Sequence, residues 1–138
     1  MKVIGISGSP RKGNTEWMLN RLLERITENG AEAELVLLRK IDIKLCRGCL
    51  SCEEGGKNRK GVCKIQDDMN AIYPKLLKAD CIVFATPAYF ELVSGLLKKE
   101  QVMDFMSMAG KLCSVVFVVT HSGHHQDVPA VNNWLLMM

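Results

Sequence analysis

Apolar positions follow two different patterns along the chain, and the two patterns alternate. Four short runs, at residues 3–7, 33–38, 81–85 and 114–119, are largely apolar and predict strands that are buried on both faces. The stretches between them carry apolar residues at helical spacing, which predicts amphipathic helices. We expect the buried faces of these helices to hold, in chain order, Trp17, Met18, Leu22, Leu23 and Ile26, then Met69, Ile72, Leu76 and Leu77, then Leu92, Leu96, Val102 and Met103.

Capping residues mark the ends of the first two helices. Asn14 or Thr15 is the predicted N-cap of the first helix, and Asn29-Gly30 is expected to end it. Asp67 or Asp68 is the predicted N-cap of the second helix.

Alternating strands and helices of this kind predict an α/β fold, a doubly wound parallel sheet with helices on both faces. Right-handed crossovers bring the loops that follow the first, third and fourth strands to one edge of the sheet, where such folds bind ligands. The function is therefore expected on residues 7–15, 86–95 and 120–126. We predict a single domain, residues 1–138, with a cysteine-rich insertion at residues 46–63.

The end of the chain leaves room for one short helix at residues 128–138 after the fourth strand. A fifth strand is therefore not expected, and the fourth strand would form an unpaired edge of the sheet. Because monomers avoid exposing such an edge, we expect a homo-oligomer, a dimer or a larger assembly.

Composition narrows the class of protein further. The 138 residues are 48% hydrophobic and 24% charged, which is ordinary for one globular domain. The net charge of +3, from 18 basic and 15 acidic residues, is too small to indicate a nucleic-acid partner. No apolar run approaches a membrane span. Because Met1-Lys2 leads directly into the first predicted strand, we do not expect a signal peptide. We therefore expect a cytoplasmic protein, in which thiols stay reduced.

The first loop, residues 7–15, combines glycine and hydroxyl groups at the start of a helix, where free N–H groups hold phosphate. Its glycine spacing does not fit the dinucleotide fingerprint. A nucleoside-triphosphate loop nearly matches but is not expected, because Asn14 stands where that loop needs its lysine. The remaining alternatives are an ordinary capped turn and a site for one phosphate monoester. The second would use Ser9, Arg11, Asn14 and Thr15.

Two aromatic residues follow the third strand, in the sequence Pro87-Ala88-Tyr89-Phe90. At the edge of a parallel sheet they offer a surface for a flat heterocycle, although alone they are more typical of a core or an interface.

Three motifs together resemble the flavodoxin-like NAD(P)H-dependent FMN reductase family. They are residues 8–15, residues 86–90 with Ser94-Gly95, and the more degenerate residues 120–123. The resemblance implies a flavodoxin-like sheet, here shortened at its C-terminus, with the FMN phosphate on the first loop and the isoalloxazine against the second. It implies hydride transfer from NAD(P)H to flavin and no catalytic acid–base pair. The residues it assigns to FMN are Ser7, Ser9, Pro10, Arg11, Gly13, Asn14, Thr15, Pro87, Ala88, Tyr89, Phe90, Ser94, Gly95, Thr120, Ser122 and Gly123.

Four cysteines, Cys46, Cys49, Cys52 and Cys63, lie in the insertion after the second strand. Two successive gaps of two residues let three sulfur atoms converge, as in ferredoxin runs. The segment resembles that of the iron–sulfur flavoproteins, a branch of the same family, which implies a [4Fe-4S] cluster. Reduced or redox-active thiols and a zinc site are the alternatives. Cys81 and Cys113 begin apolar strands and are expected to be small core residues.

The leading hypothesis is an FMN-binding oxidoreductase of the iron–sulfur flavoprotein type. It would take electrons from NAD(P)H or a ferredoxin-type donor. The alternative is a truncated, catalytically weak FMN-binding module or a zinc-stabilised interaction module. The resemblance also favours association, since family members bring the cysteine segment of one subunit near the flavin of another.

Overall fold

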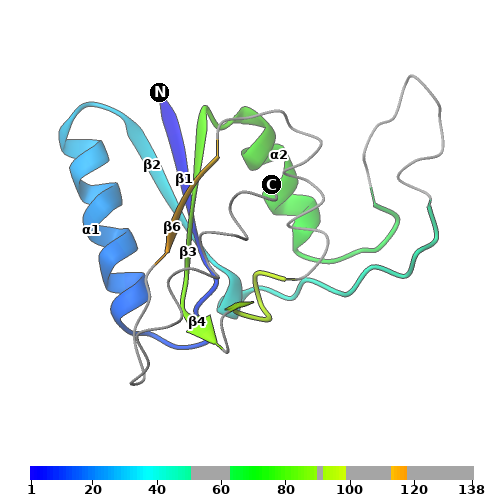
Figure 1. Cartoon of the computed structure of the whole chain (residues 1–138). Helices are drawn as coiled ribbons and strands as arrows, with labels where there is room; N and C mark the ends of the chain where they lie inside the picture. The colour runs from blue at the N-terminus through cyan, green and yellow to red at the C-terminus, as the bar shows by residue number, and fades with distance from the viewer. Residues whose placement is uncertain (51–62, 90–91, 99–112, 118–138) are drawn as a thin grey trace.

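The computed structural model describes residues 1–50, 63–89, 92–98 and 113–117, and these form the expected parallel sheet (Figure 1). Its strand order is β2-β1-β3-β6, and all neighbouring strands are parallel. The bounds are β1 (Lys2–Ser7), α1 (Asn14–Glu28), β2 (Glu32–Leu37), the 3-10 helix η1 (Leu38–Lys40), α2 (Met69–Lys78), β3 (Cys81–Thr86) and β6 (Cys113–Phe117). A second, two-stranded antiparallel sheet is formed by β4 (Ala88–Tyr89) and β5 (Leu92–Val93).

Helix α1 covers one face of the sheet and α2 lies on the other, as Figure 1 shows. On the α1 face, Leu19 and Leu23 pack with strand residues Val3 and Val83. The helix comes so close to β1 that a Cβ atom on Gly5 would lie 2.8 Å from a Leu23 methyl group. Glycine at this position therefore allows the helix to pack directly on the backbone of the strand.

The larger core lies on the α2 face, where Ile4 and Ile82 are fully buried against Ile72 and Leu76. Successive strand residues point to opposite faces, so Val3 and Ile4 enter different cores. This is why the predicted strands are apolar at successive positions. The prediction of a doubly wound α/β sheet is confirmed.

Two details of the first predicted helix are wrong. The N-cap is Gly13, and Asn14 and Thr15 are instead the first two helical residues. Trp17 and Met18 were expected on the buried face, but they are 64% and 45% exposed. The buried stripe runs through positions 19 and 23, which are one turn apart and face the sheet. The predicted end is confirmed: Asn29 is the C-cap and Gly30 adopts a φ of +83°.

Helix α2 begins as predicted, at an aspartate pair. Asp68 is the N-cap residue, and the carboxylate of Asp67 accepts a hydrogen bond from the Met69 N–H group at 2.9 Å. Met69, Ile72 and Leu76 are buried, but Leu77 is 47% exposed, which contradicts its predicted place on the apolar face. Leu76 already fills the position toward the sheet, so its neighbour points about 100° away from it.

The helix predicted from Leu92 onward does not begin there. Leu92 and Val93 form β5, which pairs with Ala88 and Tyr89, and a turn follows at residues 95–98. Pairing with β4 replaces the helix at this point. Val102, Met103, the end of the fourth predicted strand after Phe117, and residues 128–138 with the question of a fifth strand lie outside the described residues. Among the helices of the described residues, none combines the length and the apolar character that a membrane span requires.

Candidate functional site

A cavity of about 320 Å³ opens where the first loop meets the segment after β3. Figure 1 shows β4 at the same end of the sheet as the start of α1. This is the carboxyl edge of the parallel strands, where the sequence predicts ligand binding. The lining residues are Ser9, Arg11, Lys12, Gly13, Asn14, Thr15, Pro87 and Tyr89.

One wall of this cavity is the loop after β1 and the other is the segment after β3, and Gly8 forms hydrogen bonds that join the two. Its N–H group donates to the Ala85 carbonyl oxygen at 2.8 Å, which continues the pairing of β1 with β3. Its carbonyl oxygen accepts a hydrogen bond from the Ser94 hydroxyl group. A Cβ atom on Gly8 would lie 3.0 Å from Ser94 Oγ and 3.1 Å from Leu97 Cβ, so the close approach requires glycine.

Buried hydrogen bonds of Thr86 and Ser94 stabilise the wall that follows β3. The Thr86 hydroxyl accepts a hydrogen bond from the Ser94 N–H group at 3.1 Å and donates to the Pro87 carbonyl oxygen at the same distance. Both residues are almost completely buried. Ser94 therefore supports both loops, although it does not line the cavity.

The start of α1 has the properties of an anion site. Gly13 provides no side-chain cap, so the first N–H groups of the helix have no capping side chain. Thr15 lines the cavity and is 3% exposed, and its hydroxyl has no hydrogen-bond partner within the described residues. Arg11 and Lys12 add two positive charges to the same wall. This donor set fits one phosphate group.

The hydroxyl of Ser9 is used inside the loop. It donates to the Arg11 carbonyl oxygen at 2.7 Å and accepts from the Arg11 N–H group at 3.4 Å. The Ser9 N–H group in turn donates to Ser7 Oγ at 3.4 Å. Ser9 and Ser7 thus shape the turn that presents the helix N-terminus.

The predicted flavin residues therefore divide into four groups. Among those described, Ser9, Arg11, Gly13, Asn14, Thr15, Pro87 and Tyr89 line the cavity, whereas Ser7 and Ser94 are buried beneath it and Pro10, Ala88 and Gly95 do not line it. Phe90, Thr120, Ser122 and Gly123 lie outside the described residues. Sequence reasoning missed Lys12, whose only signal was a second positive charge in the loop.

Residues 41–50, which carry Cys46 and Cys49, lead away from the sheet on the α2 side (Figure 1). Cys46 and Cys49 are exposed and Cys63 is half-buried. Backbone N–H groups donate to two of the sulfur atoms at 3.4 Å, from Gly48 to Cys46 Sγ and from Ile65 to Cys63 Sγ. Such donors stabilise thiolates that ligate metal clusters.

The cysteine ligand set is not assembled in the described residues. There, no group of three or more His, Cys, Asp and Glu side chains is arranged to hold a metal ion. Cys52, the third cysteine of the predicted set, lies outside these residues. Cys81 is half-buried beside the α1 core, as expected, and the side chain of Cys113 is not described.

Hydrogen bonds to two carboxylates hold the start of the cysteine segment, at residues 42–44, against its end, at residues 66–68. The Asp68 carboxylate accepts from the Asp42 N–H group at 2.7 Å, and the Asp67 carboxylate accepts from the Lys44 N–H group at 2.9 Å. The Lys44 ammonium group donates to the Gln66 carbonyl oxygen at 2.9 Å. The two described ends of the cysteine segment are therefore held together, and Cys46 and Cys63 each lie a few residues from this contact.

Comparison with known proteins identifies the family. The family model described as NADPH-dependent FMN reductase matches residues 1–137. An iron–sulfur flavoprotein of Archaeoglobus fulgidus is 40% identical over 71% of this chain and 46% of its own length. An iron–sulfur flavoprotein of Methanocaldococcus jannaschii is 44% identical over 71% of this chain and 49% of its own length. The chain thus spans about half the length of these two relatives.

A solved structure gives the same fold. The crystal structure of RosB with a bound 8-demethyl-8-formylriboflavin-5'-phosphate superposes with a TM-score of 0.68. It is 15% identical in sequence, and the match covers 99% of this chain and 59% of RosB. The chain therefore belongs to the NADPH-dependent FMN reductase family, in which its sequence groups with the iron–sulfur flavoproteins.

Proposed function

We propose that this chain binds FMN by its phosphate at the start of α1 and acts as an NAD(P)H-dependent flavin oxidoreductase. The observation that carries the proposal is Thr15, a buried hydroxyl without a partner in the described structure, which lines the cavity beside an uncapped helix N-terminus. A phosphate oxygen is the acceptor that this hydroxyl and these N–H groups lack. Membership of the FMN reductase family supports the same ligand.

The other residues of the site have distinct tasks in this proposal. Arg11 and Lys12 supply positive charge at the open rim, where they attract a phosphate dianion. Pro87 and Tyr89, on the opposite wall, offer apolar and aromatic surface toward the flavin ring. Bound FMN itself supplies the redox chemistry by accepting a hydride from a nicotinamide, so the protein needs to contribute position and electrostatics.

The phosphate assignment is tested by comparing two flavins. Riboflavin has the ring of FMN but no phosphate, so Thr15→Val should weaken FMN binding by about tenfold and leave riboflavin binding nearly unchanged. Thr27→Val is the matched control, because Thr27 lies at the far end of the same helix and its hydroxyl bonds to the Leu23 carbonyl oxygen. Equal weakening of both flavins by Thr15→Val would contradict the assignment.

Turnover is tested separately. Purified chain supplied with FMN should oxidise NADH or NADPH without oxygen until the flavin is reduced. A ferredoxin-type donor is the alternative source of electrons. A chain that binds FMN but accepts electrons from neither source would be the binding module considered above.

We further propose that Cys46, Cys49, Cys52 and Cys63 hold one [4Fe-4S] cluster. The N–H donors to the Cys46 and Cys63 sulfur atoms and the hydrogen bond that joins the two ends of the cysteine segment support this, as do the names of the relatives. The cluster would pass single electrons to or from FMN. Reconstituted protein that contains stoichiometric zinc and no sulfide would instead support a structural metal site.

The chain is also proposed to work as a homo-oligomer. Trp17 and Met18 lie on the exposed side of α1, and β6 is the last strand of the described sheet. Large apolar side chains on a surface and a sheet edge are the features that association covers.

A further inference from the structure

One ion pair of the molecule lies beside the phosphate loop and is nearly buried. The Arg39 guanidinium, on η1, lies 2.6 Å from a carboxylate oxygen of Glu16, in the first turn of α1. The side chains are 16% and 10% exposed. The pair joins the end of β2 to the start of α1, across 23 positions of sequence.

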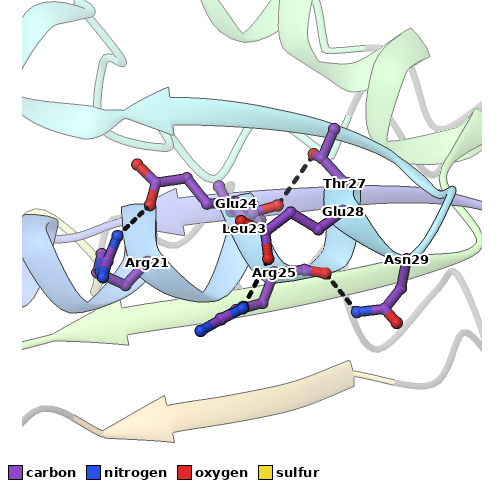
Figure 2. A network of polar contacts seen from close by, with 7 residues as sticks. All are labelled: Arg21, Leu23, Glu24, Arg25, Thr27, Glu28 and Asn29. Carbon is purple, nitrogen blue, oxygen red and sulfur yellow. Dashed lines mark hydrogen bonds and ion pairs between the residues drawn. The ribbon is translucent and has the colours of Figure 1, made fainter.

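Two other ion pairs on the same helix differ from this one in that their side chains are exposed to solvent. Figure 2 shows Arg21 with Glu24 and Arg25 with Glu28, in the part of the helix that follows the first turn. All four side chains are at least 55% exposed. Exposed pairs of this kind contribute little to stability, and salt screens the attraction between their charges. In a nearly buried pair the two charges are screened much less, and removing one of them leaves the other uncompensated.

The position of Glu16 gives its charge a particular effect. Glu16 directly follows Thr15 and belongs to the first turn of α1, in which Asn14 and Thr15 line the cavity, although Glu16 itself does not line it. A carboxylate at this point competes with a bound phosphate for the positive end of the helix dipole and repels it directly. The Arg39 guanidinium neutralises that carboxylate and holds it at η1.

We propose that Arg39 is a positioning residue that makes this site selective for phosphorylated flavin. It acts through Glu16 and not by contact with the ligand. Without Arg39, the loop would keep its shape but carry an uncompensated negative charge against the phosphate. The inference rests on the proposed FMN site and names the pair that determines its discrimination between FMN and riboflavin.

The test is a double-mutant cycle measured with FMN and with riboflavin. Arg39→Ala should weaken FMN binding by about tenfold or more and change riboflavin binding by less than about threefold. The double variant Glu16→Gln/Arg39→Ala should return FMN binding to within about threefold of the original chain. Glu16→Gln alone leaves no buried unpaired carboxylate, and it should bind FMN at least as tightly as the original chain.

Arg25→Ala is the matched control, because it removes an arginine from an exposed pair and should change neither flavin. Equal loss of both flavins in Arg39→Ala would mean that the pair only stabilises the fold, and would overturn the inference. Persistent weak FMN binding in the double variant would overturn it too, since Arg39 would then contact the phosphate itself. If Arg39→Ala fails to fold, weaker FMN binding by Glu16→Gln decides against the inference. If the unsubstituted chain bound FMN and riboflavin with equal affinity, the proposed phosphate site itself would be contradicted, and not only the role of Arg39.

Discussion

The hydroxyl group of Ser94 donates a hydrogen bond to the carbonyl oxygen of Gly8, a residue 86 positions earlier in the chain. Both residues are buried, and the bond joins the loop after β1 to the turn after β5. The two walls of the proposed flavin site are thereby fixed relative to each other before any ligand binds. Preorganisation of this kind lowers the cost of ordering the site on binding.

Ser94→Ala is therefore expected to lower the free energy of unfolding by about 1–3 kcal/mol, because the Gly8 carbonyl oxygen loses its hydroxyl donor in a buried place. Urea denaturation measures the change. FMN binding should weaken as well. Gly95→Ala is the control: a Cβ atom there meets nothing within 4 Å, so stability should stay nearly constant. Equal stability of Ser94→Ala and the original chain would show that the bond does not hold the loops together.

Asp67 is expected to stabilise two segments at once. Its carboxylate accepts from the N–H groups of Lys44 and Met69, so it joins the two ends of the cysteine segment and also satisfies the first N–H group of α2. Asp67→Ala should cost about 1–2 kcal/mol in unfolding free energy. Asp80→Ala, which removes one exposed carboxylate bond to the Lys2 N–H group, should cost less than about 0.5 kcal/mol. If urea denaturation showed that Asp67→Ala and Asp80→Ala lower the unfolding free energy equally, Asp67 would not stabilise two segments.

The cysteine proposal predicts about four irons and a similar amount of sulfide per chain after anaerobic reconstitution. Cys63→Ser should lower the iron content well below that of the original chain, because it removes one of four ligands. Cys81→Ala should retain the iron, since Cys81 begins β3 and lies beside the α1 core. Iron loss in both variants would point to unfolding, and iron retention in both would exclude Cys63 as a ligand.

Association is tested by sedimentation at micromolar concentration. The predicted mass is at least twice the 15.4 kDa of one chain. A particle of 15.4 kDa that keeps its FMN would mean that the chain closes its own exposed surfaces.

The sheet was predictable because its signal is local. Runs such as Val3–Ile4 and Ile82–Val83 are apolar at successive positions, and such a run is typical of a short strand that is covered on both faces. The carboxyl edge and the loops that meet there follow from the right-handed connection of these strands. Thr86 and Ser94, by contrast, act through hydrogen bonds to backbone groups, which no spacing of residue types reveals.

The start of α1 shows where local reasoning failed. Asn14 and Thr15 are good N-cap residues, but they occupy the first two positions inside the helix, beside the cavity. Trp17 and Met18 were predicted to be core residues together with Leu23, but the sheet buries only Leu23 of these three and adds Leu19, which was not predicted. The Glu16–Arg39 pair depends on the tertiary approach of η1 to the helix and has no signal in the sequence.

The most direct test follows the backbone amide signals of Asn14, Thr15 and Glu16 by nuclear magnetic resonance while flavin is added. Hydrogen bonding to a phosphate moves amide protons to higher frequency. FMN should therefore shift these three signals strongly, and riboflavin at equal saturation should leave them nearly unchanged. Signals that stay in place with bound FMN, or that move equally with riboflavin, would contradict a phosphate site at the start of α1.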